Sequence, residues 1–358
     1  MYITFVVAVV LIVKSIVFNP KGRIMQNSNK NKLYPLLFTP IYKEIMWGGD
    51  LMNSHLGRKT PDSDVPIAES WEISDRPDAI SVVKNGPLSG KTIRELLETC
   101  GKELLGDAYR PQKRFPLLVK LIDAGKRLSL QVHPDEIACA KMPGAEPKTE
   151  MWYVIAAKPE GRIFAGLKHT CTKRQFLDYV ESNEIENCLQ SFQSIVGDAY
   201  FINSGTVHAI GAGNLLLEIQ QNSNTTYRLS DWGRVGPDGH PRELHVQEAL
   251  ECVNFADRSS PRIPAESTTT SHNRRLPLIN RCPFFNVTAL KLTSNWIDNT
   301  ENRIPHLLTT IDKAITIKGN LNDVIVERGE TCLVPANYGN YDIDIGNAAE
   351  ATVLRTTF

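Results

Sequence analysis

One stretch of the sequence sets the interpretation of all the rest: Arg127-Leu128-Ser129-Leu130-Gln131-Val132-His133-Pro134-Asp135. Up to His133, aliphatic and polar residues alternate, which is the pattern of a β-strand with one buried face. Gln131 and His133 therefore share a face of this strand. An amide oxygen and an imidazole placed in this way can both reach one metal ion, provided that the chain supplies further ligands.

The composition limits the classes of function. The chain has 358 residues, enough for two domains and a large core. Lysine plus arginine and aspartate plus glutamate each total 40. A neutral, evenly mixed surface gives no indication of nucleic acid or an anionic membrane as a partner. An anionic small molecule would therefore need a local cluster of basic residues.

The N-terminal segment 1–24 is unlike the remainder of the chain. Residues 2–13 are almost all apolar, and Lys14 precedes a second apolar run. Twelve apolar residues are too few for a standard spanning helix. Three interpretations stay open: a signal sequence, a membrane anchor over residues 2–18 in which Lys14 snorkels, and translation that begins at Met25. We favour the start at Met25, with no membrane partner unless residues 2–18 are retained.

The cysteines indicate a reducing compartment. Seven are scattered through the chain, and no C-x-x-C pair occurs: Cys100, Cys139, Cys171, Cys188, Cys252, Cys282 and Cys332. This usage predicts reduced thiols and a cytoplasmic protein rather than a disulfide framework, and it argues against a cysteine-based zinc site.

Short strands separated by turns dominate the rest of the sequence and predict a mainly β fold, a sandwich or a barrel. Helical periodicity occurs only at 92–105 and 172–189, which predicts two surface helices. A polar, turn-rich linker is predicted at 258–275. It separates a larger domain, 25–257, from a smaller β domain, 276–358, in which we find no metal-binding cluster.

Two further residues can complete a metal site with His133. Glu150 opens an apolar strand, and His208 follows the turn-rich sequence Asn203-Ser204-Gly205-Thr206-Val207. Two imidazoles and one carboxylate are a typical set for catalytic zinc. The spacing of the three residues matches no fixed motif. Taken singly, each histidine can therefore equally be a hydrogen-bonded structural residue, and the glutamate can equally be a solvated surface residue.

Several longer motifs resemble the type I mannose-6-phosphate isomerase (phosphomannose isomerase) family, in particular its shorter bacterial form, and they occur in the order typical of that family. The segments that carry the resemblance are residues 131–135, 148–152, 205–211 and 218–228, with weaker matches at 40–44, 47–49 and 68–74.

The resemblance implies a double cupin, that is, two jelly-roll β-barrels with a few surface helices and one Zn²⁺ per chain. The implied zinc ligands are His133, Glu150 and His208, joined in some members by a glutamine at the position of Gln131. The implied catalytic arginine is Arg228. The implied reaction interconverts mannose 6-phosphate and fructose 6-phosphate through a cis-enediol, and the second cupin is implied to lack a metal.

Other polar residues gain candidate roles from this chemistry. Arg228 is a permanent cation suited to binding the phosphate or stabilising an enediolate. Glu218 faces the barrel interior and is either the catalytic base or a carboxylate that orients a zinc-binding histidine. Lys148 is a candidate for phosphate binding or proton transfer. Lys120 lies within an apolar strand, where a lysine usually has a partner, and we include it among the substrate-binding residues.

The segment 230–234 departs from the family pattern, with Ser230 and Gly233 where members often carry a tyrosine and an acidic residue. Asp231 and Arg234 are expected to position Arg228. A non-catalytic cupin that binds a sugar or sugar phosphate is the main alternative function, followed by a metal-dependent oxygenase. The sequence leaves the oligomeric state and the preference among phosphosugars open.

Overall fold

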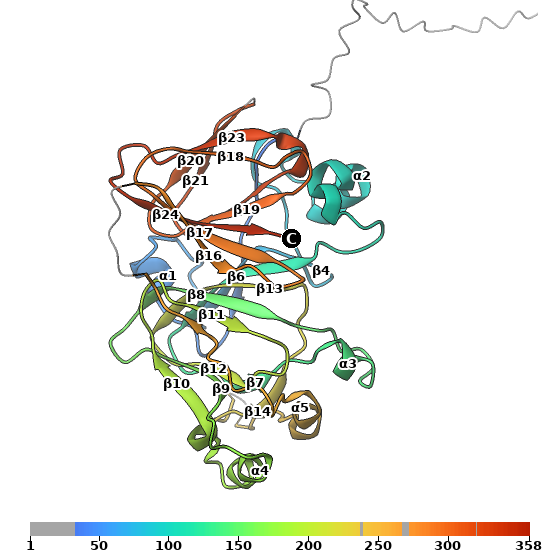
Figure 1. The fold of residues 1–358 in the computed structure, drawn as a ribbon, viewed down its shortest axis with the longest axis vertical. Helices are drawn as coiled ribbons and strands as arrows, with labels where there is room; N and C mark the ends of the chain where they lie inside the picture. Colours follow the sequence, from blue (N-terminus) through green and yellow to red (C-terminus); the bar gives the residue numbers. More distant parts are fainter. Residues whose placement is uncertain (1–32, 237–238, 267–271, 320) are drawn as a thin grey trace, which may run out of the picture. The chain divides into compact units, whose positions relative to one another are not determined.

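A computed structural model describes residues 33–236, 239–266, 272–319 and 321–358. The extension predicted at residues 1–24 lies outside these ranges. Antiparallel β-strands make up most of the regular secondary structure of the described chain, which confirms the predicted mainly β fold class (Figure 1). No helix in the described ranges has the length and apolar character needed to span a bilayer.

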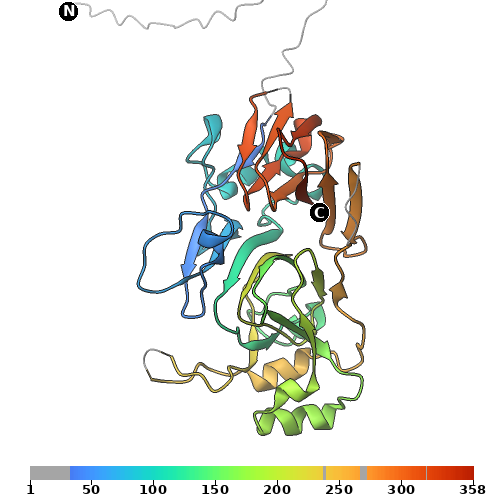
Figure 2. The same cartoon turned by 90° about the vertical axis from the view of Figure 1, so that its left-hand side faces the viewer.

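Two facing sheets form the first barrel. The larger sheet has the order β15 (Arg262–Ile263), β11 (Ala199–Ile202), β8 (Glu150–Ala157), β13 (Asn214–Gln221), β6 (Leu117–Ala124), β3 (Ile67–Ile73) and β2 (Ile41–Glu44). The smaller sheet has the order β10 (Leu189–Gln193), β9 (Arg162–Leu167), β12 (His208–Ile210), β7 (Leu130–Val132) and β14 (Tyr227–Ser230). In Figure 2 the green and yellow strands of this barrel close around its interior.

The second barrel is built in the same way. Its larger sheet has the order β1 (Leu36–Leu37), β22 (Thr331–Val334), β19 (His306–Thr310), β24 (Ala351–Thr357), β17 (Asn286–Leu292) and β16 (Arg274–Ile279). Its smaller sheet has the order β18 (Trp296–Asn299), β23 (Asn340–Asp344), β20 (Ile315–Gly319) and β21 (Val324–Val326). Two barrels, each of two antiparallel sheets, give the double jelly-roll architecture that the family resemblance implies.

The chain passes between the barrels more than once. Strand β1, close to the start of the described residues, pairs with β22 of the second barrel, with Leu36 opposite Leu333. Strand β15 lies inside the predicted linker 258–275 and pairs with β11 of the first barrel. Strand pairing thus crosses the predicted domain limits. The division into a larger domain 25–257, a linker 258–275 and a smaller domain 276–358 stays a prediction.

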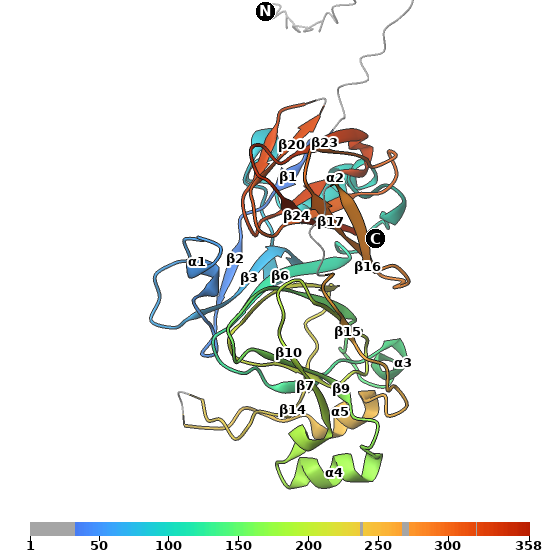
Figure 3. The same cartoon turned by 60° about the vertical axis from the view of Figure 1, so that its left-hand side comes forward.

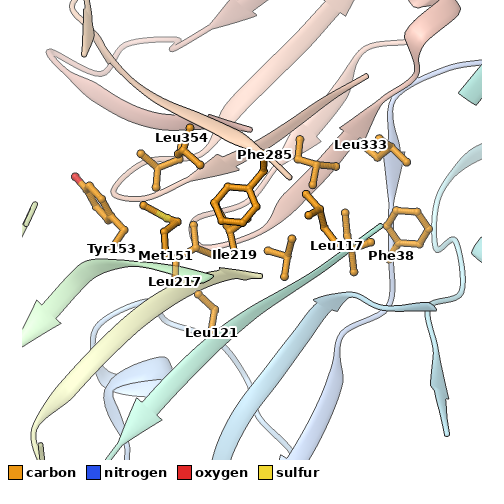
Figure 4. Packing of buried hydrophobic residues seen from close by; sticks show 14 of the residues in the cluster. Phe38, Leu117, Leu121, Met151, Tyr153, Leu217, Ile219, Phe285, Leu333 and Leu354 are labelled. Carbon is orange, nitrogen blue, oxygen red and sulfur yellow. The ribbon is translucent and has the colours of Figure 1, made fainter. Parts of the chain in front are cut away.

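The central strands of the larger sheet in the first barrel are buried on both faces. On β8, Trp152 and Val154 belong to a cluster inside the first barrel, whereas Met151 and Tyr153 belong to a cluster that also contains Phe285 from the second barrel. Figure 4 shows this second cluster packed between the two barrels. Because side chains alternate along a strand, the same strands hold the barrels together and line the first barrel's interior.

The helices lie around the barrels (Figure 3). They are α1 (Leu51–Ser54), α2 (Ile93–Leu105), α3 (Glu136–Cys139), α4 (Lys173–Glu181) and α5 (Val246–Cys252). The prediction at 92–105 is confirmed, and a capping box between Thr92 and Glu95 starts this helix. The continuous helix predicted at 172–189 is wrong, because α4 ends at Glu181 and Asn183 takes a left-handed φ of 62°. Only a short 3₁₀ turn, Ile185–Cys188, follows.

One cysteine prediction is also wrong. Cys171 and Cys188 form a disulfide, whereas the other five cysteines are free thiols. The two cysteines are 17 positions apart in the sequence, and the chain between them folds back through α4 and brings their Cα atoms to 5.3 Å. A pairing that depends on this fold-back leaves no short-range spacing signal in the sequence.

Candidate active site

Three strands of the first barrel bring the predicted metal ligands together. His133 follows β7, Glu150 begins β8, and His208 begins β12. Strand β7 lies between β12 and β14, so Gln131 is opposite both His208 and Arg228 in register. Opposite residues in antiparallel strands point to the same face. The sheet therefore places an imidazole, an amide and a guanidinium in one row.

The two imidazoles and the carboxylate converge on one point. Glu150 Oε2 is 3.5 Å from His133 Nε2, and Glu150 Oε1 is 3.4 Å from His208 Nε2. One ligand atom from each residue lies within 4.8 Å of the other two. All three side chains are buried. This geometry can hold a metal ion.

Hydrogen bonds orient both imidazoles for that task. His133 Nδ1 lies 2.9 Å from the Thr225 carbonyl oxygen, and His208 Nδ1 lies 2.8 Å from the Thr206 carbonyl oxygen. Because a carbonyl only accepts, each Nδ1 must carry the proton. Each Nε2 then presents a lone pair, and neither Nε2 has a hydrogen-bond partner within the described part of the chain. Two orphaned, buried acceptors beside a carboxylate fit a metal ion.

The protonation states also suit metal binding. Burial, assisted by the nearby Lys148 ammonium, lowers the pKa of His133 to about 3. Burial likewise lowers the pKa of His208. Burial opposes ionisation of Glu150, but Lys148 and the two histidines outweigh it and hold the pKa of Glu150 well below its usual range. The set is therefore neutral imidazole and ionised carboxylate, the forms that bind a metal.

Lys148 belongs to the same cluster. Its Nζ is 2.8 Å from Glu150 Oε2, and the side chain is 6% exposed. Its backbone N–H donates to the Pro134 carbonyl oxygen, which ties the segment before β8 to the residue after His133. The predicted proximity of Lys148 and Glu150 is therefore present in the fold.

A second charged group lies deeper along the barrel wall. Lys120 on β6 is opposite Glu218 on β13, and its Nζ lies 3.1 Å from Glu218 Oε2 and 3.6 Å from Glu69 Oε2. Trp152 Nε1 donates to Glu218 Oε1 at 3.0 Å. Glu69 is the partner that the sequence reasoning missed. The only sequence signal for Glu69 is its place in the motif 68–74, two residues before Trp71. In the structure, Lys120 Nζ also lies 5.3 Å from the centroid of the Trp71 ring.

These contacts bear on the two interpretations of Glu218. Both imidazole Nδ1 atoms are bound by backbone carbonyls, so Glu218 binds neither of them. Burial and the neighbouring Glu150 carboxylate raise the pKa of Glu218 above its usual value. Burial disfavours the charge on Lys120, but Glu218 and Glu69 outweigh it and raise the pKa of Lys120. Glu218 is thus a buried carboxyl group held against a permanent cation.

Arg228 lies at the other side of the row, on β14. Its Nη1 donates to the Glu243 carbonyl oxygen at 2.6 Å, and its backbone N–H donates to His245 Nδ1 at 3.2 Å. Burial and the nearby Arg242 lower its pKa. The sequence predicts that Asp231 and Arg234 position Arg228. In the structure, the Asp231 carboxylate instead forms ion pairs with Arg234 and Arg242. Glu243 and His245, which the sequence reasoning missed, lie outside every recognised motif.

Comparisons with known proteins give the relatives of the chain. A family model described as the catalytic domain of type I phosphomannose isomerase matches residues 36–187. The mannose-6-phosphate isomerase ManA of Bacillus subtilis is 34% identical over 321 residues, which cover 87% of this chain and 96% of that protein. A mannose-6-phosphate isomerase of Streptococcus mutans is 29% identical over 87% of this chain and 95% of its own length.

Solved structures give the same result. The crystal structure of the Bacillus subtilis mannose 6-phosphate isomerase superposes with a TM-score of 0.79 at 28% identity, covering 91% of this chain and all of that one. Identity above 30% across nearly the whole length of ManA extends the likeness beyond the fold alone. The chain therefore belongs to the type I phosphomannose isomerases, the family of aldose–ketose isomerases that act on mannose 6-phosphate.

Proposed function

We propose that this chain interconverts mannose 6-phosphate and fructose 6-phosphate through a cis-enediol and depends on one zinc ion for this reaction. The observation that carries the proposal is the pair of orphaned, buried Nε2 atoms of His133 and His208 on either side of the Glu150 carboxylate. Nitrogen and carboxylate ligands with space for a further ligand are typical of catalytic zinc. Gln131, in register with His208, is the proposed additional oxygen ligand.

A bound zinc ion would stabilise negative charge that develops on the sugar oxygens. The reaction itself breaks the C2–H bond of the aldose and places a proton on C1, so C1 is reduced and C2 is oxidised without an external redox partner. A base must take the C2 proton and an acid must return it to C1. The chain therefore needs one group that exchanges a proton near both carbons.

We assign proton transfer to Glu218. To Lys148 we assign hydrogen bonding to the oxygen atoms of the sugar. Glu218 is buried, and its raised pKa brings a carboxyl group closer to the pH at which it can both accept and return a proton. Lys120 and Trp152 hold the carboxyl group in place and leave it little freedom to rotate. The Lys148 ammonium, beside Glu150, can donate hydrogen bonds to sugar oxygens.

We assign charge stabilisation and phosphate binding to Arg228. A guanidinium binds phosphate or an enediolate through a fixed fork of donors and does not lose its proton at working pH. Lys120 is buried and already paired with two carboxylates, Glu218 and Glu69, so its first role is to hold Glu218 in place. The cytoplasmic location stays a prediction from the cysteine usage, against which the Cys171–Cys188 disulfide now counts.

A coupled assay tests the proposal directly. Formation of fructose 6-phosphate from mannose 6-phosphate should stop when the zinc is removed by a chelator and return when zinc is added. His208→Ala should lose both zinc and activity, because the remaining histidine and carboxylate cannot retain the ion. A His208→Ala protein that keeps full activity without zinc would exclude the proposed site.

A further inference from the structure

A carboxylate outside the site connects the segments that carry the site residues. Glu146 lies in the irregular segment before β8 and pairs with two arginines from separate segments of the chain. Arg76, on the short strand β4 (Asp75–Arg76), binds Glu146 Oε2, and Arg114, just before β6, lies 3.1 Å from Glu146 Oε1. The same Arg76 Nη1 also donates to the Asn222 carbonyl oxygen at 3.1 Å.

Thr225 links Glu146 directly to a predicted zinc ligand. The Glu146 backbone N–H donates to Thr225 Oγ1 at 3.0 Å. The Thr225 carbonyl oxygen accepts from His133 Nδ1 at 2.9 Å. One residue therefore connects the position of Glu146 with the rotation and the tautomer of the His133 ring. That carbonyl is the group that leaves His133 Nε2 free to bind a metal.

The same segment is joined to the rest of the site by further hydrogen bonds. Ser223 Oγ donates to the Glu146 carbonyl oxygen at 2.9 Å and accepts from the Thr225 N–H at 3.2 Å. Three residues after Glu146, the Thr149 N–H donates to Gln221 Oε1 at 2.8 Å. Lys148 and Glu150 flank Thr149. A shift of Glu146 would therefore move three site residues together: His133, Lys148 and Glu150.

The exposure of these ion pairs indicates what they contribute. The Glu146 side chain is 35% exposed, and those of its partners Arg114 and Arg76 are 39% and 13% exposed. An ion pair as exposed as that of Glu146 with Arg114 adds little to the free energy of unfolding. Segments without helical or strand hydrogen bonds, in contrast, depend on side chains for their placement. Two arginines on one carboxylate are therefore better explained by placement of the segment than by stability of the fold.

We propose that Glu146 is a positioning residue. Held by Arg76 and Arg114, it acts through Thr225 to keep His133 Nε2 directed at the metal and to set the place of Lys148. This proposal rests on the proposed function, since it assumes a zinc ion at His133. It adds a role for residues that touch neither the metal nor the substrate.

A double-mutant cycle tests the proposal. In Glu146→Ala the arginines lose their shared acceptor, and in Thr225→Val the Oγ1 acceptor is lost while the carbonyl to His133 remains. We expect each variant to bind zinc about tenfold more weakly, measured by competition with a chromophoric chelator, and to show a lower kcat. Because both act through one chain of contacts, the double variant should lose little more than either single variant.

Two further variants separate positioning from a general structural effect. Glu146→Gln keeps one acceptor oxygen for an arginine, so its zinc affinity should fall between those of the wild type and Glu146→Ala, even if the alanine variant folds poorly. Glu251→Ala is the matched control, because it removes the exposed pair between Glu251 and Lys141, 3.6 Å apart, near the same loop. Its zinc affinity and kcat should equal those of the wild type.

Other results would overturn the proposal. A folded Glu146→Ala protein with wild-type zinc affinity and kcat would exclude a positioning role, as would losses that multiply in the double variant. A lower melting temperature with unchanged zinc affinity would show that the ion pairs of Glu146 with Arg76 and Arg114 only stabilise the fold. Failure of the proposed function has a different signature, in which the wild type itself binds no zinc or His208→Ala retains it.

Discussion

At the scale of single residues, burial sets the charge of the two imidazoles of the site, and hydrogen bonding sets their tautomer. Burial lowers the pKa of His133 and of His208, so both rings stay neutral at physiological pH. The carbonyls of Thr225 and Thr206 then decide which nitrogen keeps the proton. Both Nε2 atoms are thus oriented in a way that can receive a metal ion, by backbone atoms that sequence motifs do not name.

Arg228 gives the first prediction at this scale. Arg228→Ala should fold normally and retain zinc, because Arg228 contacts Glu243 and His245 rather than the imidazoles. We expect kcat/KM to fall by about 100- to 1000-fold, the usual cost of removing a group that stabilises developing charge. Steady-state kinetics and metal analysis measure the two effects. Arg228→Lys keeps the charge but loses the planar guanidinium, so its kcat/KM should lie between those of the wild type and the alanine variant. Near-normal turnover in the alanine variant would exclude the proposed role of Arg228.

Asp123 gives a prediction about pH. Burial, with repulsion from Asp50, raises the pKa of Asp123 to about 6, while its Oδ2 accepts from the Met52 N–H at 2.7 Å. A carboxyl group with a raised pKa binds more protons in the folded state. Its contribution to the free energy of unfolding is therefore complete below about pH 4 and is lost as the pH rises through about 6.

Asp123→Asn should remove this dependence, since an amide oxygen can still accept from the Met52 N–H. Relative to the wild type, we expect the variant to gain roughly 2 kcal/mol in the free energy of unfolding between pH 4 and pH 7.5. Urea unfolding at the two pH values measures this difference. Asp78→Asn, on an exposed turn, is the control and should show no such change. An equal pH dependence in the Asp123→Asn protein would contradict the prediction.

At the scale of elements, strand β8 explains why the site is where it is. One face of β8 carries Glu150 and Trp152 into the first barrel, and the other carries Met151 and Tyr153 toward the second barrel. A strand packed on both faces cannot slip by one residue without exchanging the two sets. The position of the Glu150 carboxylate is thus fixed by the packing between the barrels.

The segment that includes α4 is fixed in a different way. Cys171 and Cys188 are 17 positions apart in the sequence, and a disulfide that closes a loop of this size typically contributes about 3 kcal/mol. Reduction should lower the free energy of unfolding by about that amount, measured by urea unfolding with and without dithiothreitol. Thiol titration of the unfolded protein should give five thiols before reduction, the number of free cysteines. Seven thiols before reduction would show that the bond does not form in solution.

A variant separates the bond from other effects of the reductant. Cys171→Ser/Cys188→Ser should be less stable than the oxidised wild type, and dithiothreitol should not change its stability further. Cys100→Ser, which removes a free thiol on α2, should respond to the reductant as the wild type does. Zinc affinity should be unchanged in both, because the hydrogen bonds that orient His133 and His208 come from the Thr225 and Thr206 carbonyls, outside the segment closed by the disulfide.

At the scale of the whole molecule, the two barrels share one hydrophobic core. The largest cluster joins Leu117, Met151 and Ile219 of the first barrel to Phe285 and Leu354 of the second, as Figure 4 shows. Such a shared core couples the unfolding of the barrels. Residues 33–358 form one compact unit, so we expect a single cooperative transition.

Phe285→Ala tests that coupling. Phe285 is fully buried between the barrels, and truncating a buried phenylalanine typically costs about 3–5 kcal/mol. Urea unfolding followed by tryptophan fluorescence and by circular dichroism should shift by that amount, with coincident curves. Ile297→Ala, at a side chain that is 73% exposed, is the control and should change little. Two separate transitions would show that the barrels unfold independently.

Much of the fold and of the site follows from the local sequence. Alternating residues predict the β-strands, because the side-chain period of a strand is visible within a few residues. The segment around His133, with the motifs at Glu150 and His208, indicates the metal ligands before any contact is known. Arg228 and Lys148 come from the same motifs. Pattern and motif therefore suffice for what short segments encode.

Tertiary structure decided the remainder. Register alone places Gln131 beside His208 and Lys120 opposite Glu218. The helix expected at 172–189 breaks after Glu181, the disulfide forms, and β1 joins the second barrel. Each of these depends on segments far apart in the sequence that meet only once the sheets have formed. The convergence of His133, Glu150 and His208 on one point has the same origin, because sheet order and strand register, rather than sequence spacing, set those distances.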